Sequence, residues 1–215
     1  METGRSAKPW EIREAEFVVS AARRSDYPRP PLPQVAFAGR SNVGKSALLN
    51  CLVRRRRLAK TSRTPGLTQL INFFLINGRW HFVDLPGYGY AKAPPVAQEK
   101  WRRMVEAYLT ENPNLRLLVL LLDVRRVPSP LDDQLVEFLE LRGIPAQAVL
   151  TKCDKLKRNA LAKARREIGG RYGLSGESLP IATSAVTGAG REDLLRRIAE
   201  ELERGVSAGP QSSPQ

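Results

Sequence analysis

The chain has 215 residues, of which 42% are hydrophobic and 27% charged, and its formal net charge is +13. These values fit a globular protein with one α/β domain, and the longest apolar run, LLVLLLDV at 117–124, falls far short of the ~20 residues of a membrane-spanning helix. The charge excess favours a polyanionic partner, either nucleic acid or an anionic membrane surface, although an arginine-rich solvated surface would have the same composition.

The two ends of the chain differ in composition from its middle. Residues 1–33 form an N-terminal extension ending in YPRPPLP, which holds too many prolines for a helix or a central strand. We expect it to pack on the domain or to lead stiffly into it, with a PxxP-type docking peptide as the alternative. Residues 205–215 have little to bury and are expected to form a disordered tail. This leaves residues 34–204 as the folded domain.

Targeting and redox signals are lacking. The N-terminal stretch METGRSAKPWEIREAEF has no apolar signal core. The two cysteines, Cys51 and Cys153, match no metal-binding or redox spacing. We therefore expect a cytoplasmic protein with reduced thiols and no membrane association.

Strand and helix patterns alternate along the middle of the chain. The apolar run 34–39 stops at a glycine and predicts a buried strand, and 45–53 has helical spacing. Two strands flank Asn77-Gly78, a strong signal for a two-residue hairpin. Further helices are predicted at 96–111, 131–142, 156–170 and 191–203, and further strands at 115–123, 146–152 and 179–185. This order predicts a three-layer α/β fold, with helices on both faces of a mostly parallel six-stranded sheet that has one antiparallel edge strand.

The segment GRSNVGKS, between the first predicted strand and helix, matches the phosphate-binding pattern G-x-x-x-x-G-K-[ST]. Its glycines allow the backbone N–H groups and the helix N-terminus to approach phosphates. Lys45 would bridge the β and γ oxygens, and Ser46 would offer its hydroxyl to Mg²⁺. The alternative is a glycine-rich turn without a ligand. The predicted phosphate contacts are Gly39, Arg40, Ser41, Asn42, Val43, Gly44, Lys45 and Ser46.

A second motif, TKCD at 151–154, follows a later strand and predicts which base is bound. An aspartate at position 154 can accept hydrogen bonds from guanine N1–H and the exocyclic amino group, which adenine lacks. The stem of Lys152 can cover the base, and the TSA segment can present the Ala185 amide to guanine O6. The alternative for TKCD alone is a surface turn. The predicted base contacts are Thr151, Lys152, Cys153, Asp154, Thr183, Ser184 and Ala185.

Four segments together resemble the TRAFAC-class GTPases, and more closely the bacterial EngB family of ribosome-biogenesis GTP-binding proteins. They are VAFAGRSNVGKS, SRTPGLTQLINFF, VDLPGYGYAK and VLTKCDK, in the family's order and at similar spacing within about residues 15–203. Threonine in place of the usual asparagine in the base motif, and PGYGYA after the aspartate, mark this branch. The resemblance implies a Ras-like, monomeric GTP/GDP switch that acts on the large ribosomal subunit or its rRNA and is thereby needed for cell division and septation.

Two other functions would use part of the same sequence. A P-loop kinase lacks support, because no substrate lid is evident and a kinase has no use for TKCD. A GTP-regulated scaffold at the division site, with little RNA affinity, stays open as the alternative.

The resemblance assigns further residues. Thr68 would ligate Mg²⁺ when the γ-phosphate is present, with Thr64 as the competing threonine; Asp84 would hold Mg²⁺ through a water. The expected catalytic set is Lys45, Thr68 and Gly87, the last through an amide that senses the γ-phosphate. Residues 54–69 and 85–95 would be the two switches. The remaining implied GTP contacts are Gly66, Leu67, Gln69, Leu70, Leu85 and Pro86, where Leu67 stands at a position that is commonly basic in the family.

Tyr88 stands where well-known small GTPases carry the glutamine that orients the attacking water. A phenol has one hydroxyl and cannot replace a primary amide in that task. We therefore predict a slow GTPase in which the Tyr88 side chain swings away. Asn42 either helps to hold a K⁺ ion beside the phosphates or serves only the loop geometry.

Basic residues are concentrated in two regions. The segment 51–70 contains six and no acidic residue, namely Arg54, Arg55, Arg56, Arg57, Lys60 and Arg63, and 152–171 contains eight against two acidic. Such surfaces suit the phosphate backbone of rRNA, although each cluster alone would pass as a solvated face. One of Arg54–Arg57 could also reach the phosphates as an arginine finger in cis, although nothing in the spacing requires it. His81, the single histidine, is expected to pack or lie at the surface rather than act in catalysis.

Overall fold

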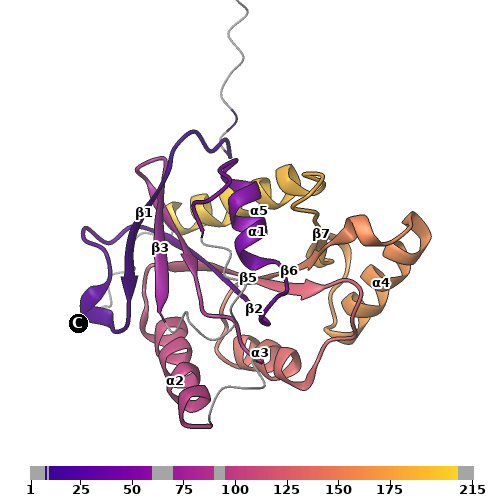
Figure 1. The fold of residues 1–215 in the computed structure, drawn as a ribbon, viewed down its shortest axis with the longest axis horizontal. Coiled ribbons are helices and arrows are strands. Elements are labelled where there is room, and N and C mark those ends of the chain that lie inside the picture. Colours follow the sequence, from indigo (N-terminus) through magenta and orange to yellow (C-terminus); the bar gives the residue numbers. More distant parts are fainter. Residues whose placement is uncertain (1–7, 9, 60–69, 90–94, 208–215) are drawn as a thin grey trace, which may run out of the picture.

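The computed structural model describes residues 8, 10–59, 70–89 and 95–207. These residues form one seven-stranded sheet with helices on both faces (Figure 1). The strands are β1 (Ala15–Ala21), β2 (Gln34–Gly39), β3 (Ile71–Ile76), β4 (Trp80–Asp84), β5 (Leu115–Asp123), β6 (Ala146–Thr151) and β7 (Ile181–Ala182). The helices are α1 (Lys45–Leu52), α2 (Pro95–Glu111), α3 (Pro130–Leu141), α4 (Arg158–Arg171) and α5 (Arg191–Ser207). Over the described ranges, no helix is long and apolar enough to span a bilayer.

The sheet is mostly parallel, in the order β1-β3-β4-β2-β5-β6-β7, and this confirms the predicted fold class. The pairs β4–β2, β2–β5, β5–β6 and β6–β7 are parallel. The predicted hairpin is also confirmed: β3 and β4 pair antiparallel, and Asn77 and Gly78 have φ values of 50° and 64° at its turn. Positive φ at both central residues is the geometry that matches the twist of the flanking strands.

The N-terminal segment supplies a strand that the sequence did not reveal. β1 pairs antiparallel with β3, so the sheet has seven strands instead of the predicted six. β1 is therefore the edge strand, and the antiparallel strand β3 lies between β1 and β4. β1 escaped detection because its pairing register shifts between Phe17 and Val19, which breaks the alternation of buried and exposed side chains. β1 therefore forms through its pairing with β3, and its own sequence carries no clear alternation of apolar and polar residues.

Two element boundaries also differ from the prediction. β7 contains only Ile181 and Ala182 of the predicted 179–185, because the chain leaves the sheet after the Thr183 N–H donates to the Leu150 carbonyl oxygen. Near the C-terminus, α5 continues to Ser207, past the predicted end of this helix at residue 203.

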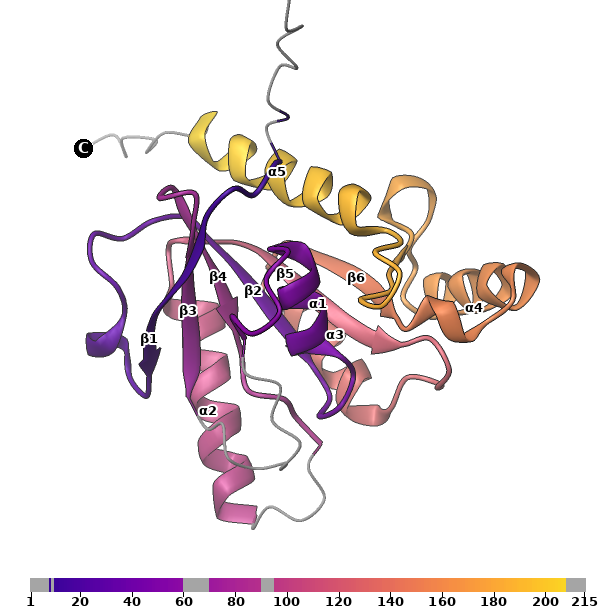
Figure 2. The ribbon, with the colours of Figure 1, turned by 45° about the horizontal axis from the view of Figure 1, so that its top comes forward.

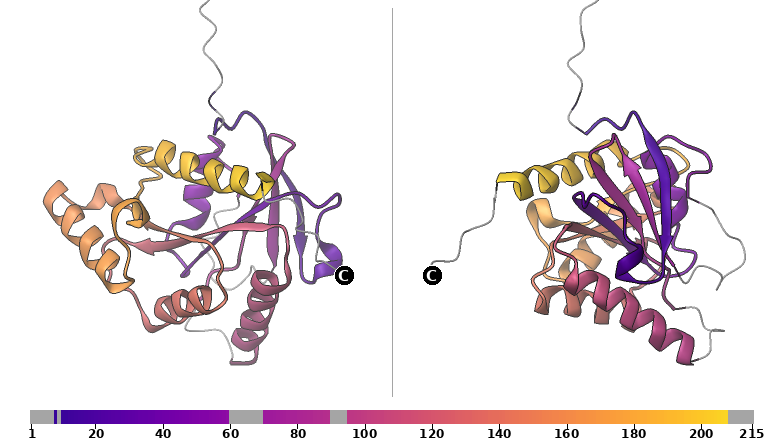
Figure 3. Two further views of the ribbon diagram at one scale, coloured as in Figure 1. Left: turned by 180° about the vertical axis from the view of Figure 1, so that it is seen from behind. Right: turned by 90° about the vertical axis from the view of Figure 1, so that its left-hand side faces the viewer.

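The helices divide between the two faces of the sheet. α1 and α5 cover one face, and their side chains share a core with inward-facing residues of β2, β3 and β5. α2 and α3 cover the other face and pack on the alternate residues of the strands, and α4 packs on the same face next to α3. Figures 2 and 3 show α5 and α2 on opposite sides of the sheet. The long apolar strand β5 is buried on both faces, as a central parallel strand must be.

Candidate nucleotide-binding site

The carboxyl ends of four neighbouring parallel strands bring most of the predicted site residues together. β4, β2, β5 and β6 lie side by side. The phosphate loop, residues 39–46, follows β2, Asp84 closes β4, and Thr151 closes β6. In open α/β sheets, ligands bind outside this edge. Segments more than 100 residues apart in sequence therefore meet at one site.

The phosphate loop turns tightly into the start of α1. Asn42 and Gly44 both have positive φ, 66° and 108°, and the Val43 N–H donates to the Arg40 carbonyl oxygen at 3.1 Å. A Cβ on Gly39 would lie 2.9 Å from the Leu121 carbonyl oxygen, so β2 and β5 approach this closely only because that residue is glycine. The loop leaves the N-terminal amide groups of α1 at the site, where they suit an anion.

Lys45 and Asp84 form an ion pair next to this loop. Their side chains are only 11% and 9% exposed. Buried ion pairs rarely add net stability, so binding is the better reason to place these charges here. A carboxylate and the Ser46 hydroxyl are the hard oxygen donors that Mg²⁺ prefers, and the Lys45 ammonium suits phosphate. The residues present thus fit a magnesium-bound phosphate chain.

The base motif and the loop after β7 are held against each other. The Cys153 N–H donates to the Thr183 carbonyl oxygen at 3.0 Å, and the Ser184 hydroxyl donates to Asp154 Oδ1 at 2.6 Å. The Ser184 hydrogen bond, with support from Lys155, lowers the pKa of Asp154, so this carboxyl is ionised at neutral pH. Ser184 Oγ also accepts the N–H groups of Val186 and Thr187, which shapes the loop around exposed Ala185. An ionised carboxylate beside a loop that carries the Ala185 backbone amide suits the donors and acceptors of guanine.

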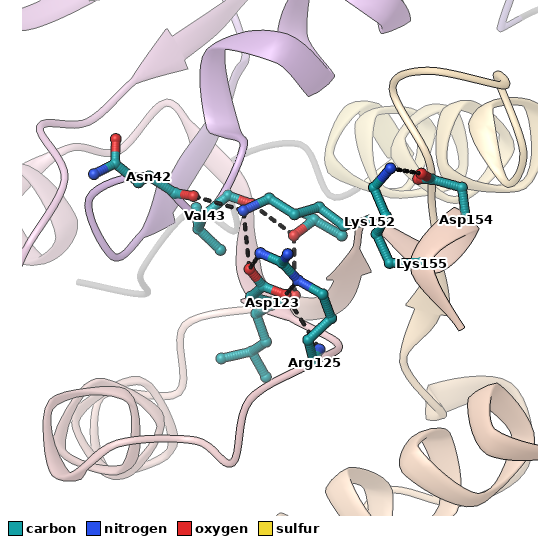
Figure 4. A network of polar contacts seen from close by, with 9 residues as sticks. Asn42, Val43, Asp123, Arg125, Lys152, Asp154 and Lys155 are labelled. Carbon is teal, nitrogen blue, oxygen red and sulfur yellow. Dashed lines mark hydrogen bonds and ion pairs between the residues drawn. The ribbon is translucent and has the colours of Figure 1, made fainter. Parts of the chain in front are cut away.

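Asp123 is a site residue that the sequence reading missed. Its carboxylate accepts from the Lys152 ammonium at 2.9 Å and from the Arg125 guanidinium at 2.7 and 2.9 Å (Figure 4). Burial alone would raise the pKa of Asp123, but the hydrogen bonds from Arg125 and Lys152 outweigh it and hold that pKa well below the ordinary value. A charged residue that directly follows the apolar run 117–122 was the signal available in the sequence.

The same network ties the base motif to the phosphate loop. Lys152, which has a positive φ of 61°, also donates to the Asn42 carbonyl oxygen at 2.8 Å. The Thr151 hydroxyl donates to the Val43 carbonyl oxygen at 2.7 Å. Figure 4 shows the Lys152 side chain lying between Asn42 and Asp123. The stem of Lys152 is thereby fixed across the space between the two motifs.

Comparisons with known proteins agree with this geometry. The family model described as 50S ribosome-binding GTPase matches residues 34–152. A probable GTP-binding protein EngB from Pelotomaculum thermopropionicum is 50% identical over 187 residues, which cover 87% of this chain and 94% of that protein. A probable GTP-binding protein EngB from Pelobacter propionicus is 57% identical over 153 residues, which cover 71% of this chain and 76% of that protein. A crystal structure of a probable GTP-binding protein engB has a TM-score of 0.68 at 26% identity and covers 80% of this chain and 99% of that one.

The chain belongs to the EngB family. It is therefore a P-loop GTPase, which binds GTP and hydrolyses it to GDP and phosphate. A crystal structure of Aquifex aeolicus Era bound to GDP·AlF₄⁻ shares the fold, with a TM-score of 0.66 at 23% identity over 86% of this chain and 59% of that one.

Part of the first switch expected in this EngB chain lies outside the described residues. This holds for both candidate Mg²⁺ threonines and their neighbours: Lys60, Arg63, Thr64, Gly66, Leu67, Thr68 and Gln69. Leu70 is described and exposed, just before β3. In the second switch, Leu85 is fully buried in the core under α2, so it can reach a nucleotide only through its backbone. Pro86 and Gly87 follow it, and a Cβ on Gly87 would lie 3.2 Å from the Ser41 backbone.

The side chains of Tyr88 and His81 contact residues outside the phosphate loop. The Tyr88 side chain is turned toward α3, where its hydroxyl donates to Asp132, in agreement with the prediction that it swings away. His81 is buried and packs edge-on against Phe73, in the packing role predicted for it. Its Nδ1 has no hydrogen-bond partner among the described residues.

Proposed function

We propose that this EngB protein is a cytoplasmic GTP/GDP switch with slow intrinsic hydrolysis, and that it acts in assembly of the large ribosomal subunit and is thereby needed for normal cell division and septation. The proposed binding of GTP and GDP is supported by the polar network that joins the phosphate loop to the base motif through Lys152. The family model, whose description names 50S ribosome binding, supports the partner.

The proposed site residues divide the task of binding GTP. Amides of the phosphate loop and the Lys45 ammonium bind the phosphates, and the Asp154 carboxylate accepts from the guanine edge. Magnesium, which these GTPases generally use, would be held by Ser46 and Thr68, and by Asp84 through a water, and it supplies positive charge against the phosphate oxygens. The Gly87 amide would contact only a γ-phosphate, which distinguishes GTP from GDP.

Slow hydrolysis follows from the position of Tyr88. Its hydroxyl is engaged by Asp132 at 2.6 Å, so it does not orient a water for attack on the γ-phosphate. A K⁺ ion held by Asn42 would compensate for part of this loss. The positive φ of Asn42 gives the residue a second reason to be asparagine, since asparagine tolerates that conformation well. Single-turnover hydrolysis in KCl against NaCl separates the two roles, because only a K⁺ site predicts faster hydrolysis in KCl.

Exposed arginines supply the surface for rRNA. Arg54–Arg57, directly after α1, are all exposed and form no ion pair with any described residue. α4 adds exposed Arg158, Arg165 and Arg166, which likewise have no acidic partner within the described ranges. Cations that are not neutralised by the protein itself remain available for phosphates of the RNA backbone.

Sedimentation with ribosomal subunits tests this proposal. We expect co-sedimentation with the large subunit in a non-hydrolysable GTP analogue, and weaker binding in GDP. Replacing Arg54–Arg57 with glutamine should flatten the salt dependence of binding while nucleotide affinity stays within about twofold. The matched control replaces Arg13, Arg29, Arg79 and Arg142, which are exposed elsewhere, and removes the same charge. Absence of subunit binding in both nucleotides would contradict the proposal and favour a scaffold role.

A further inference from the structure

The start of the second switch is tied to the phosphate loop by backbone hydrogen bonds. The Ser41 N–H donates to the Tyr88 carbonyl oxygen at 2.9 Å, and the Tyr88 N–H donates to the Gly39 carbonyl oxygen at 3.3 Å. Tyr88 and Arg40 thus form a parallel β-bridge that continues the pairing of β2 with β4 beyond the sheet. Gly87, the residue before Tyr88, lies against Ser41 so closely that a Cβ would meet its backbone at 3.2 Å.

The side chain of Tyr88 anchors this bridge to helix α3. It is 5% exposed, and its hydroxyl donates to Asp132 Oδ1 at 2.6 Å. Burial, together with the negative charge of Asp132, raises the pKa of Tyr88 far above its ordinary value, so the hydroxyl keeps its proton and stays a donor. A short hydrogen bond from a buried hydroxyl to a carboxylate is among the stronger polar contacts in proteins.

Asp132 is itself held rigidly at the start of α3. Its other oxygen, Oδ2, accepts from the N–H and the hydroxyl of Ser129, both at 2.7 Å. Asp132 is 3% exposed and lies in the first turn of the helix, where the backbone dipoles favour a negative charge. Each carboxylate oxygen thus has a separate task, one toward α3 and one toward Tyr88. An asparagine cannot perform both, because one of its two terminal atoms is a donor.

We propose that Tyr88 and Asp132 form a positioning pair that fixes the Gly87 amide against the phosphate loop and so tunes the affinity of the protein for GTP relative to GDP. The proposal rests on the γ-phosphate contact of Gly87 in the proposed function. Tyr88 therefore has a task in place of the missing glutamine: it does not orient water, but it holds the residue that senses the γ-phosphate. Loss of the hydroxyl leaves the backbone bridge without its anchor, and the Gly87 amide becomes less well placed.

Calorimetric titration of the full chain with GDP and with a non-hydrolysable GTP analogue tests the pair. For Tyr88→Phe, we expect the ratio of analogue affinity to GDP affinity to fall about tenfold, with GDP affinity within twofold of wild type. Asp132→Ala should lower the ratio similarly, and the double variant should lose no more than either single variant, because all three remove the same hydrogen bond. Ring packing is retained in Tyr88→Phe, which keeps the fold.

The chain offers a matched control one residue along α3. The Tyr172 hydroxyl donates to Asp133 Oδ1 at 3.0 Å, the same kind of contact without a link to Gly87. Tyr172→Phe should leave the affinity ratio unchanged even where it lowers thermal stability. Gly87→Ala tests the γ-phosphate contact separately and should lower the ratio. An unchanged ratio in Tyr88→Phe beside a lowered ratio in Gly87→Ala would overturn the positioning pair alone. An unchanged ratio in Gly87→Ala would overturn both the pair and the proposed contact.

Discussion

The Lys152 ammonium lies 2.9 Å from Asp123 Oδ2 and 2.8 Å from the Asn42 carbonyl oxygen, so one side chain connects the end of β5, the base motif and the phosphate loop. A lysine with four rotatable bonds would otherwise sample many conformations at the site. Held at its tip, it presents its stem in one place, where it can cover a base. Asp123 thus contributes to nucleotide binding through Lys152.

Removal of this carboxylate should weaken both nucleotides equally. For Asp123→Asn we expect GTP and GDP affinity to fall about tenfold each, because Lys152 loses a charged partner worth roughly 1.5 kcal/mol. Calorimetric titration measures both. Asp133→Asn is the control, since that carboxylate is also held by an arginine, Arg171, but lies away from the site. Equal affinities for Asp123→Asn and wild type would remove Asp123 from the site.

Glycines at two positions should respond in opposite directions to alanine. In Gly39→Ala, the Cβ would lie 2.9 Å from the Leu121 carbonyl oxygen and equally close to Val43 Cγ1, so we expect a loss of about 1–3 kcal/mol in the free energy of unfolding. Gly170, within α4, has open space around its Cβ position, so Gly170→Ala should stabilise by about 0.5–1 kcal/mol. Urea denaturation of both variants measures the difference. A Gly39→Ala protein as stable as wild type would show that β2 and β5 can separate at no cost.

His81 should make stability dependent on pH in a narrow window. Burial lowers the pKa of His81 in the folded protein below the unfolded value of ~6.5, because the charged form cannot be solvated. Above pH ~6.5 the ring is neutral in both states, and pH has no effect through it. As pH falls below ~6.5, His81 binds a proton in the unfolded chain but stays neutral in the folded protein. The free energy of unfolding therefore declines, with a slope of at most ~1.4 kcal/mol per pH unit.

The measurement compares wild type with His81→Phe between pH 7 and pH 5.5. His81 is the single histidine, so the variant should lose little stability over this range while wild type loses some. If the free energy of unfolding depends on pH in the same way in both proteins, the pKa of His81 is not lowered by folding, and the account is contradicted.

The sequence predicted most of the fold because its signals were local. The glycine-stopped strand β2, the Asn77-Gly78 hairpin and the apolar strand β5 each carry their pattern within a few residues. β1 was missed because it is defined by pairing with β3, a long-range interaction. β7 was predicted too long because the carbonyl and amide groups around Thr183 bond to the base-motif strand and loop instead of continuing the ladder.

The candidate site was predictable where a motif fixes the spacing and unpredictable where the fold supplies the partner. Lys45, Ser46 and Asp154 stand in recognisable patterns. Asp123 and Asp132 do not, because each acquires its role only when β5 or α3 is placed beside the phosphate loop. The partner of Tyr88 lies 44 residues away in sequence, and no local pattern connects the two.

Exchange of the base is the most direct test of base recognition by Asp154. Asp154→Asn should weaken GTP binding by about 2–4 kcal/mol, because guanine donors lose a charged acceptor, and xanthosine triphosphate, whose edge carries an acceptor in place of the amino group, should bind the variant better than GTP does. The Ser184 hydroxyl can still donate to the asparagine oxygen, so the loop after β7 is kept. Titration of wild type and Asp154→Asn with both nucleotides decides the matter: a reversed preference is the predicted result, and unchanged GTP affinity in the variant would contradict the assignment.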